Sequence, residues 1–140
     1  MTGPWEPLTL TRERGRAALR LTCVPMGRDL AVALAGGDRP HIGAVAVSQP
    51  RPSHLEDGGT SATTSVITLP GHKEDDLART LAARLASELD VTVCVACGIH
   101  LDRIRPEELR DVLELAADLA DELLNQLRLA SPQGSPEGQG

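Results

Sequence analysis

Three of the chain's four histidines lie next to glycines in short segments, and each segment borders an apolar stretch. The segments are PHIG at residues 40–43, PGHK at residues 70–73 and GIHLD at residues 98–102. Imidazole can bind protons, metal ions or phosphate oxygens, and glycine lets the backbone approach a ligand closely. If the apolar stretches pair in one sheet, His41, His72 and His100 can meet at its rim and form a site.

His100 and Asp102 are two residues apart, so an extended backbone places both side chains on one face. They follow a buried stretch that is typical of a parallel strand, and ligands commonly bind beyond the carboxyl ends of such strands. The pair can therefore share a metal ion or a ligand. The alternative is structural: Asp102 accepts a hydrogen bond from a backbone amide, and His100 packs in the turn.

His72 and Lys73 begin a predicted helix, and Lys73 is the only lysine among fourteen basic residues. Free amides at a helix N-terminus, together with the lysine charge, favour a phosphate group. The acidic residues that follow, Glu74, Asp75 and Asp76, would repel an anion unless they face away or a cation intervenes. An ordinary acidic first turn with a solvated Lys73 is the alternative.

Three imidazoles and one carboxylate would suffice for a metal site with His41, His72, His100 and Asp102 as its ligands. A second function is therefore open, a small metal-dependent hydrolase or lyase in which Glu74 is the base. The spacing matches neither a zinc finger nor the His-Glu-x-x-His pattern, so the metal is not identified. A Gly-x-Ser-x-Gly elbow is absent, and the residues do not indicate a nucleophilic enzyme.

The three cysteines are too few for a disulfide framework. Cys94 and Cys97 lie within one apolar strand, where residues three apart point to opposite faces, so the two thiols cannot readily bridge or share a metal. We expect the cysteines to be buried structural thiols.

Composition limits the function classes. Twenty acidic against fourteen basic residues give a formal charge of −6, which argues against nucleic-acid binding. The sole aromatic residue is Trp5, so the core must be aliphatic and stacking on a bound ring is nearly unavailable. Because no apolar run approaches the roughly 18 residues of a membrane span, we expect a cytoplasmic protein without membrane contact.

The apolar pattern predicts an α+β fold: a mixed, mainly antiparallel sheet of about five strands, in the order β-β-β-β-α-β-α, with two helices packed on one face. Residues 5–16 offer a weak edge strand at best, and residues 49–60 are expected to be an exposed loop with His54 solvated. The strands are expected at residues 18–24, 30–35, 42–48, 63–69 and 91–97, and the helices at residues 72–89 and from residue 105 onward.

The helix before the fifth strand suits a parallel right-handed crossover. The outer face of the last helix is a candidate contact for a partner or a second copy, as in a homo-oligomer. A length of 140 residues suits one domain, which we assign to residues 1–129. Residues 130–140, rich in Ser, Pro, Gly and Gln, are expected to be a disordered tail.

Taken together, Gly36-Gly37 with PHIGAVA at residues 40–46, LPGHKED at residues 69–75 and GIHLD at residues 98–102 resemble the LpdD-like prenylated-flavin chaperone family. The resemblance covers about residues 17–127. Members of this family, which include proteins like the D subunit of gallate decarboxylase, accompany UbiD-type decarboxylases, whose cofactor is prenylated FMN.

The resemblance implies a non-catalytic chaperone that binds prenylated FMN and assists its delivery to, or its maturation in, a UbiD-type decarboxylase. A flavin prenyltransferase is a further partner to consider, and a divalent metal a further ligand. A purely structural subunit of the decarboxylase, whose glycine turns serve folding only, is another interpretation. The ligand-facing residues that the resemblance implies are Gly37, His41, Gly43, Gly71, His72, Lys73, His100 and Asp102.

Overall fold

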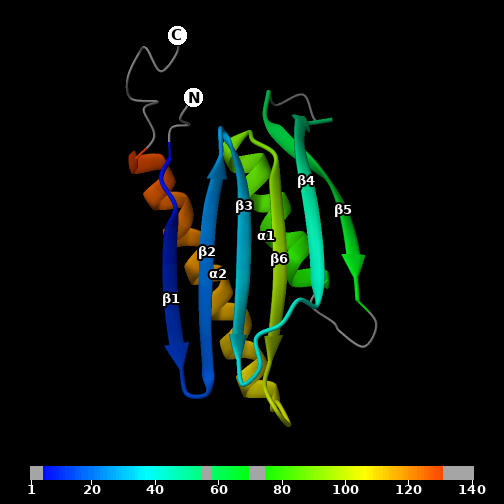
Figure 1. Cartoon of the computed structure of the whole chain (residues 1–140). Helices are drawn as coiled ribbons and strands as arrows, with labels where there is room; N and C mark the ends of the chain where they lie inside the picture. The colour runs from blue at the N-terminus through cyan, green and yellow to red at the C-terminus, as the bar shows by residue number, and fades with distance from the viewer. Residues whose placement is uncertain (1–4, 55–57, 70–74, 131–140) are drawn as a thin grey trace.

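The computed structural model describes residues 5–54, 58–69 and 75–130, which form one six-stranded sheet and two helices (Figure 1). The strands lie in the order β1-β2-β3-β6-β4-β5. All neighbouring strands are antiparallel except β3 and β6, which are parallel. The elements are β1 (Leu8–Arg14), β2 (Ala17–Met26), β3 (Asp29–Gly37), β4 (Ala44–Pro52), β5 (Thr60–Thr68), α1 (Asp75–Leu89), β6 (Val93–His100) and α2 (Pro106–Ala130).

The α+β class and the mainly antiparallel sheet are confirmed, with one strand more than predicted. The additional strand is β1, which pairs with β2 over its whole length. The strand β1 was not predicted with the others because its charged residues interrupt the apolar alternation that is typical of a strand. In the structure Leu10 is buried, and Arg12 forms an ion pair with Glu122 on α2.

The predicted loop at residues 49–60 is wrong at both ends, because β4 continues to Pro52 and β5 begins at Thr60. Pro50 and Pro52 indicated a loop, because proline has no N–H to donate to a hydrogen bond of the sheet. Beyond Ser48 the β6 side of β4 has no partner strand, while pairing with β5 continues to Pro52. The strand can therefore hold prolines whose nitrogens face that unpaired side. His54 is exposed, as predicted.

The topology brings several chain segments to one edge of the sheet. Because β3, β5 and β6 run in the same direction, their carboxyl ends lie at this edge, together with the start of the antiparallel β4. The parallel connection from β5 through α1 to β6 passes over β4, which lies between these two strands. We call this edge, at the bottom of Figure 1, the site edge.

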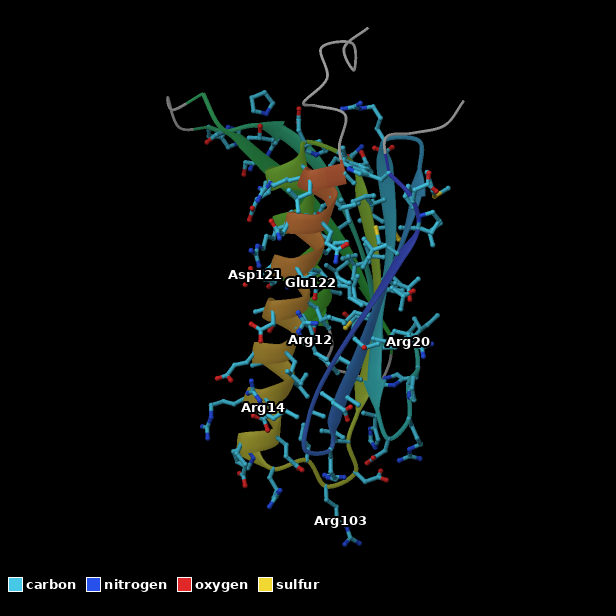
Figure 2. The ribbon with its side chains drawn as sticks, turned by 90° about the vertical axis from the view of Figure 1, so that its left-hand side faces the viewer. Arg12, Arg14, Arg20, Arg103, Asp121 and Glu122 are labelled. Atoms are coloured by element: carbon cyan, nitrogen blue, oxygen red, sulfur yellow. The ribbon has the colours of Figure 1, made fainter. Side chains whose placement is uncertain are left out.

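Both helices pack on one face of the sheet, as predicted, and Figure 2 shows them on the same side. The core between the two layers is aliphatic. It includes Leu21 and Val95 from the sheet and Leu85, Leu119 and Leu123 from the helices, each fully buried. Trp5 adds its ring at the end of α2, where the indole Nε1 donates to the carbonyl of Leu127 at 2.9 Å. Among the described residues, no helix has the length and apolar character to span a membrane.

The cysteines divide between the two faces of the sheet. Cys23 and Cys97 are buried under the helices, and burial raises the pKa of the Cys23 thiol to about 11. Cys94 faces the other way and is only half-buried. The prediction that Cys94 and Cys97 point to opposite faces is therefore confirmed, whereas the expectation that all three thiols are buried is wrong for Cys94.

Candidate functional site

The ends of β3 and β6 are joined at the site edge through a glycine. Gly37 pairs with His100 in the sheet and has a φ of +79°, a conformation that side chains disfavour. A Cβ atom on Gly37 would lie 2.2 Å from the carbonyl oxygen of His100. The same carbonyl accepts a hydrogen bond from the backbone of Asp38 at 2.6 Å. Glycine at position 37 therefore allows the backbones of β3 and β6 to lie close together.

The segment before β4 lies against the end of β6 in a similar way. A Cβ atom on Gly98 would lie 1.8 Å from the carbonyl oxygen of His41, so only glycine fits there. Gly43 is held from both sides, because its N–H donates to Cys97 and its carbonyl accepts from Leu69, both at 2.9 Å. As a result the His41 and His100 rings meet edge to face, with centroids 6.5 Å apart.

Two of the three predicted imidazoles thus come together. The third imidazole, His72, lies outside the described part of the chain. The same is true of Gly71, Lys73 and Glu74. Their proposed roles therefore stay predictions, as does the extension of α1 back to residue 72. The predicted tail at residues 130–140 is wrong at its first residue, because α2 continues to Ala130, and residues 131–140 lie outside the described part of the chain.

The carboxylate of Asp102 receives two donors on one oxygen. His100 Nε2 lies 2.9 Å from Asp102 Oδ1, and Arg39 Nη2 donates to the same oxygen at 2.8 Å. Because a carboxylate only accepts, the proton in the first contact belongs to His100 Nε2. These bonds, first that from His100 and then that from Arg39, hold the pKa of Asp102 below its ordinary value. The expected proximity of His100 and Asp102 is confirmed.

Arg16, in the β1–β2 turn, forms hydrogen bonds that connect three loops near His100 and Asp102. Its guanidinium forms two parallel bonds of 2.9 Å to Glu108, and it also donates to the Asp38 carboxylate at 3.0 Å and the Asp102 carbonyl at 2.8 Å. Glu108 is only 4% exposed. The bonds from Arg16, followed by those from Arg105, lower the pKa of Glu108 to about 2.

Glu108 also fixes the start of α2. The helix begins at Pro106, a residue that suits the first helical position, and Glu108 accepts the backbone N–H of Arg105 at 3.0 Å. A glutamate at the third helical position that reaches back to the residue before the helix is half of a capping box. The first turn of α2 is therefore anchored to the same arginine as the site edge.

An open depression of about 740 Å³ lies at this edge, lined by Arg16, Arg39, His100, Asp102 and Arg103. The side chain of Arg39 is 70% exposed. Arg103 projects away from the edge (Figure 2), and no side chain of the described residues pairs with it. The depression thus presents two accessible guanidinium groups in a chain whose net charge is −6.

The arginines were missed as site residues, although the sequence holds a signal for them. Arg39 stands two residues before His41, and Arg103 directly follows Asp102. The predicted site rested on histidine and glycine and left out arginine. The planar guanidinium group of arginine is suited to binding carboxylate and phosphate groups.

The described donor set fits a phosphate better than a metal ion. Among the residues that the structure describes, no group of three or more His, Cys, Asp or Glu side chains is placed to hold a metal. The Arg39 guanidinium, 3.0 Å from His100 Nε2, adds positive charge where a cation would need to bind. A phosphate monoester instead finds arginine and imidazole donors. For a flavin ring, the edge offers the His41 and His100 imidazoles, while Trp5 packs at the far end of α2.

Known proteins resemble this chain both in sequence and in fold. The chain is 22% identical over 125 residues to Protein LpdD of Lactiplantibacillus plantarum, an alignment that covers 86% of this chain and 85% of that protein. Among solved structures, the fold resembles a chain from the crystal structure of a chaperone complex for yeast 20S proteasome assembly. The TM-score is 0.55 at 14% identity, with 89% of this chain and 96% of the other covered.

The sequence model of the family described as prenylated flavin chaperone LpdD-like domain matches residues 13–128. This match runs from the end of β1 almost to the end of α2 and so includes every described part of the site edge. The chain therefore belongs to the LpdD-like prenylated flavin chaperone family.

Proposed function

We propose that this protein is a non-catalytic chaperone of a UbiD-type decarboxylase system, and that it binds prenylated FMN with the phosphate at the site edge. Membership of the LpdD-like family supports the chaperone role. The observation that carries the binding proposal is the exposed Arg39 guanidinium, 3.0 Å from His100 Nε2, with Arg103 lining the same depression in an acidic protein.

The contacts of Asp102 suggest how the phosphate is held. In the free protein its carboxylate accepts from both Arg39 and His100 and so keeps these donors pointing to one place. A phosphate oxygen can take over these donors, with Arg103 adding a second guanidinium. Charge-assisted hydrogen bonds of this kind contribute about 1.5–3 kcal/mol each. Asp102 then acts as a placeholder that the ligand displaces.

The flavin ring requires a different kind of contact. Without phenylalanine or tyrosine in the chain, the ring lies against the imidazoles of His41 and His100 and the glycine-rich backbone at the end of β3 and just before β4. Such contacts are weaker than aromatic stacking, and the depression is open. Both properties suit a carrier that receives the cofactor from a flavin prenyltransferase and releases it to the decarboxylase.

The direct test is anaerobic gel filtration of the purified protein with reduced prenylated FMN, with and without Mg²⁺ or Mn²⁺. We expect the flavin absorbance to elute with the protein. Flavin that elutes separately under all conditions would refute the binding proposal. Capture of the decarboxylase equally well with and without flavin, together with that result, would support a structural subunit instead.

A further inference from the structure

Among the described residues, ion pairs join the two helices at only one end. Because β5 and β6 both end at the site edge, α1 and α2 both begin near this edge and run in the same direction (Figure 1). Farther from the site edge, Arg84 on α1 pairs with Asp121 on α2, and Arg128 on α2 pairs with Glu88 on α1. The parts of the helices nearer to the site edge are not bridged in this way.

An apolar groove of about 230 Å³ lies between the helices, on the site-edge side of these ion pairs. Three of the residues that line it, Leu81, Ala116 and Ala120, are buried and form its floor. Leu77 on α1 and Leu113 on α2 line it as well, and Leu113 is 49% exposed. Because α2 contributes only alanines to the floor, the groove has room for apolar side chains from another molecule.

Three half-exposed apolar residues lead from the site edge to this groove. Ile104 lies in the β6–α2 loop and is 43% exposed, and Leu109, the fourth residue of α2, is 50% exposed. Residues at these two positions commonly pack together as a hydrophobic staple at the start of a helix. Leu113 follows Leu109 by four residues and so lies on the same side of α2. We call Ile104, Leu109 and Leu113 the apolar strip.

The unpaired charge beside the apolar strip is positive, although the chain as a whole has a net charge of −6. Arg110 directly follows Leu109, is exposed, and forms no ion pair with a described residue. The neighbouring carboxylates of Asp76 and Glu107 are already paired with arginines of this chain. A molecule that covers the strip therefore meets a guanidinium group that is suited to a carboxylate.

The strip and the groove together match a short amphipathic helix. At 1.5 Å per residue, α2 rises about 21 Å from Pro106 to Ala120, which is the length of about four helical turns. Apolar side chains that recur every three or four residues on a bound helix can enter such a groove. The ends of this chain cannot supply that helix, because residues 131–140 have no apolar side chain except proline and residues 1–4 read MTGP. The occupant therefore comes from another protein.

We propose that the UbiD-type decarboxylase docks on the apolar strip and the groove through an amphipathic helix whose apolar side is bordered by carboxylates. This inference rests on the proposed function. The strip begins in the β6–α2 loop, which also carries Asp102 and Arg103 of the depression. A helix docked on Ile104 and Leu109 lies beside the depression and leaves it open. The decarboxylase is thereby held close to the bound cofactor.

Biolayer interferometry against the purified, cofactor-free decarboxylase of the same organism measures docking. Leu113→Glu removes an apolar contact and adds a negative charge, and Arg110→Glu reverses the charge that faces the partner. Each should weaken binding at least about tenfold, and 0.5 M salt should weaken binding of the wild type. The matched controls are Leu129→Glu, since Leu129 is 78% exposed at the far end of α2, and Arg28→Glu in the β2–β3 turn. Both should bind as the wild type does, and circular dichroism checks that all variants are folded.

A fluorescent label gives an independent readout of the docking position. Acrylodan on Leu113→Cys, in a Cys94→Ser background, should shift its emission to shorter wavelength when the decarboxylase is added, because the dye leaves water. The same label on Leu129→Cys should not respond. Cys23 and Cys97 are buried and do not compete for the dye.

Co-elution of reduced prenylated FMN with the same variants separates this inference from the proposed function. Leu113 lies outside the depression, so Leu113→Glu should retain the flavin while it loses the decarboxylase. A wild type that retains flavin but does not bind the decarboxylase would overturn the docking inference alone. Binding that Leu113→Glu and Arg110→Glu leave unchanged, or that Leu129→Glu weakens equally, would also overturn it. Docking that depends on Leu113 in a protein that retains no flavin would support this surface and refute the cofactor site.

Discussion

Arg16 and Arg39 line the same depression but have different roles. Arg16 donates to Glu108, Asp38 and Asp102, and its bonds to Glu108 raise its own pKa. The Arg39 guanidinium donates to the exposed carboxylate of Asp102 and contacts His100 Nε2, and no other side chain in the described part of the chain pairs with it. The first arginine holds the loops in place, and the second is available to a ligand.

Substitution of each arginine should separate these roles. Arg16→Ala leaves the buried Glu108 without its main partner, and we expect the Tm to fall by several degrees. Arg39→Ala should leave the Tm within about one degree and weaken binding of prenylated FMN about tenfold or more, as expected for the loss of one charge-assisted bond. Thermal melts and flavin titrations measure both effects. Arg28→Ala, in the β2–β3 turn at the opposite edge, is the control and should change neither quantity. Equal effects of Arg16→Ala and Arg39→Ala on stability would contradict the division.

Gly37 makes a second prediction at the level of single residues. Gly37→Ala adds a Cβ atom 2.2 Å from the His100 carbonyl at a φ of +79°, so both steric overlap and backbone strain oppose it. Gly27→Ala is a matched control, because Gly27 has a φ of +64° but nothing within 4 Å of its Cβ position. We expect a loss of about 1 kcal/mol for Gly27→Ala and at least about twice that for Gly37→Ala in urea unfolding. Equal losses would show that the junction of β3 and β6 tolerates the added atom.

At the level of elements, the attachment of α2 should depend on pH. The pKa of Glu108 is lowered to about 2 from an ordinary value near 4.5, so its ion pair with Arg16 favours the folded state above pH 4.5. This contribution is lost as the pH falls from about 4.5 to about 2. Thermal unfolding over this range should therefore show a steeper loss of stability for the wild type than for Glu108→Gln. Parallel curves for the two proteins would show that this carboxylate is not coupled to folding.

The elements also show what the sequence could predict. Strands with regular apolar alternation, such as β2, and helices with a continuous leucine and alanine stripe, such as α1, were predicted because the local pattern determines them. The strand β1 and the end of β4 were not, because their pairing depends on neighbours: Arg12 is matched by Glu122 on α2, and Pro50 lies where one side of β4 has no partner. Such tertiary compensation leaves no periodic signal in the sequence.

For the whole molecule, the site arises from topology rather than from any single motif. Insertion of β6 between β3 and β4 brings Gly37, His41 and His100 to one edge. The glycines were expected to let a ligand approach the backbone, whereas Gly37 and Gly98 make room for the neighbouring backbone at His100 and His41. The sequence did not show which charged side chains would line the depression. The loops of Arg16, Arg39 and Arg103 are far apart along the chain, and their proximity depends on how the strands are ordered.

The most direct measurement of the central proposal is a crystal structure of the protein with prenylated FMN. We expect the phosphate oxygens within about 3 Å of the Arg39 and Arg103 guanidinium groups, with Asp102 no longer bonded to Arg39. A phosphate bound elsewhere, for instance in the groove between α1 and α2 near Leu77 and Leu113, would contradict the assignment of the site edge as the cofactor site.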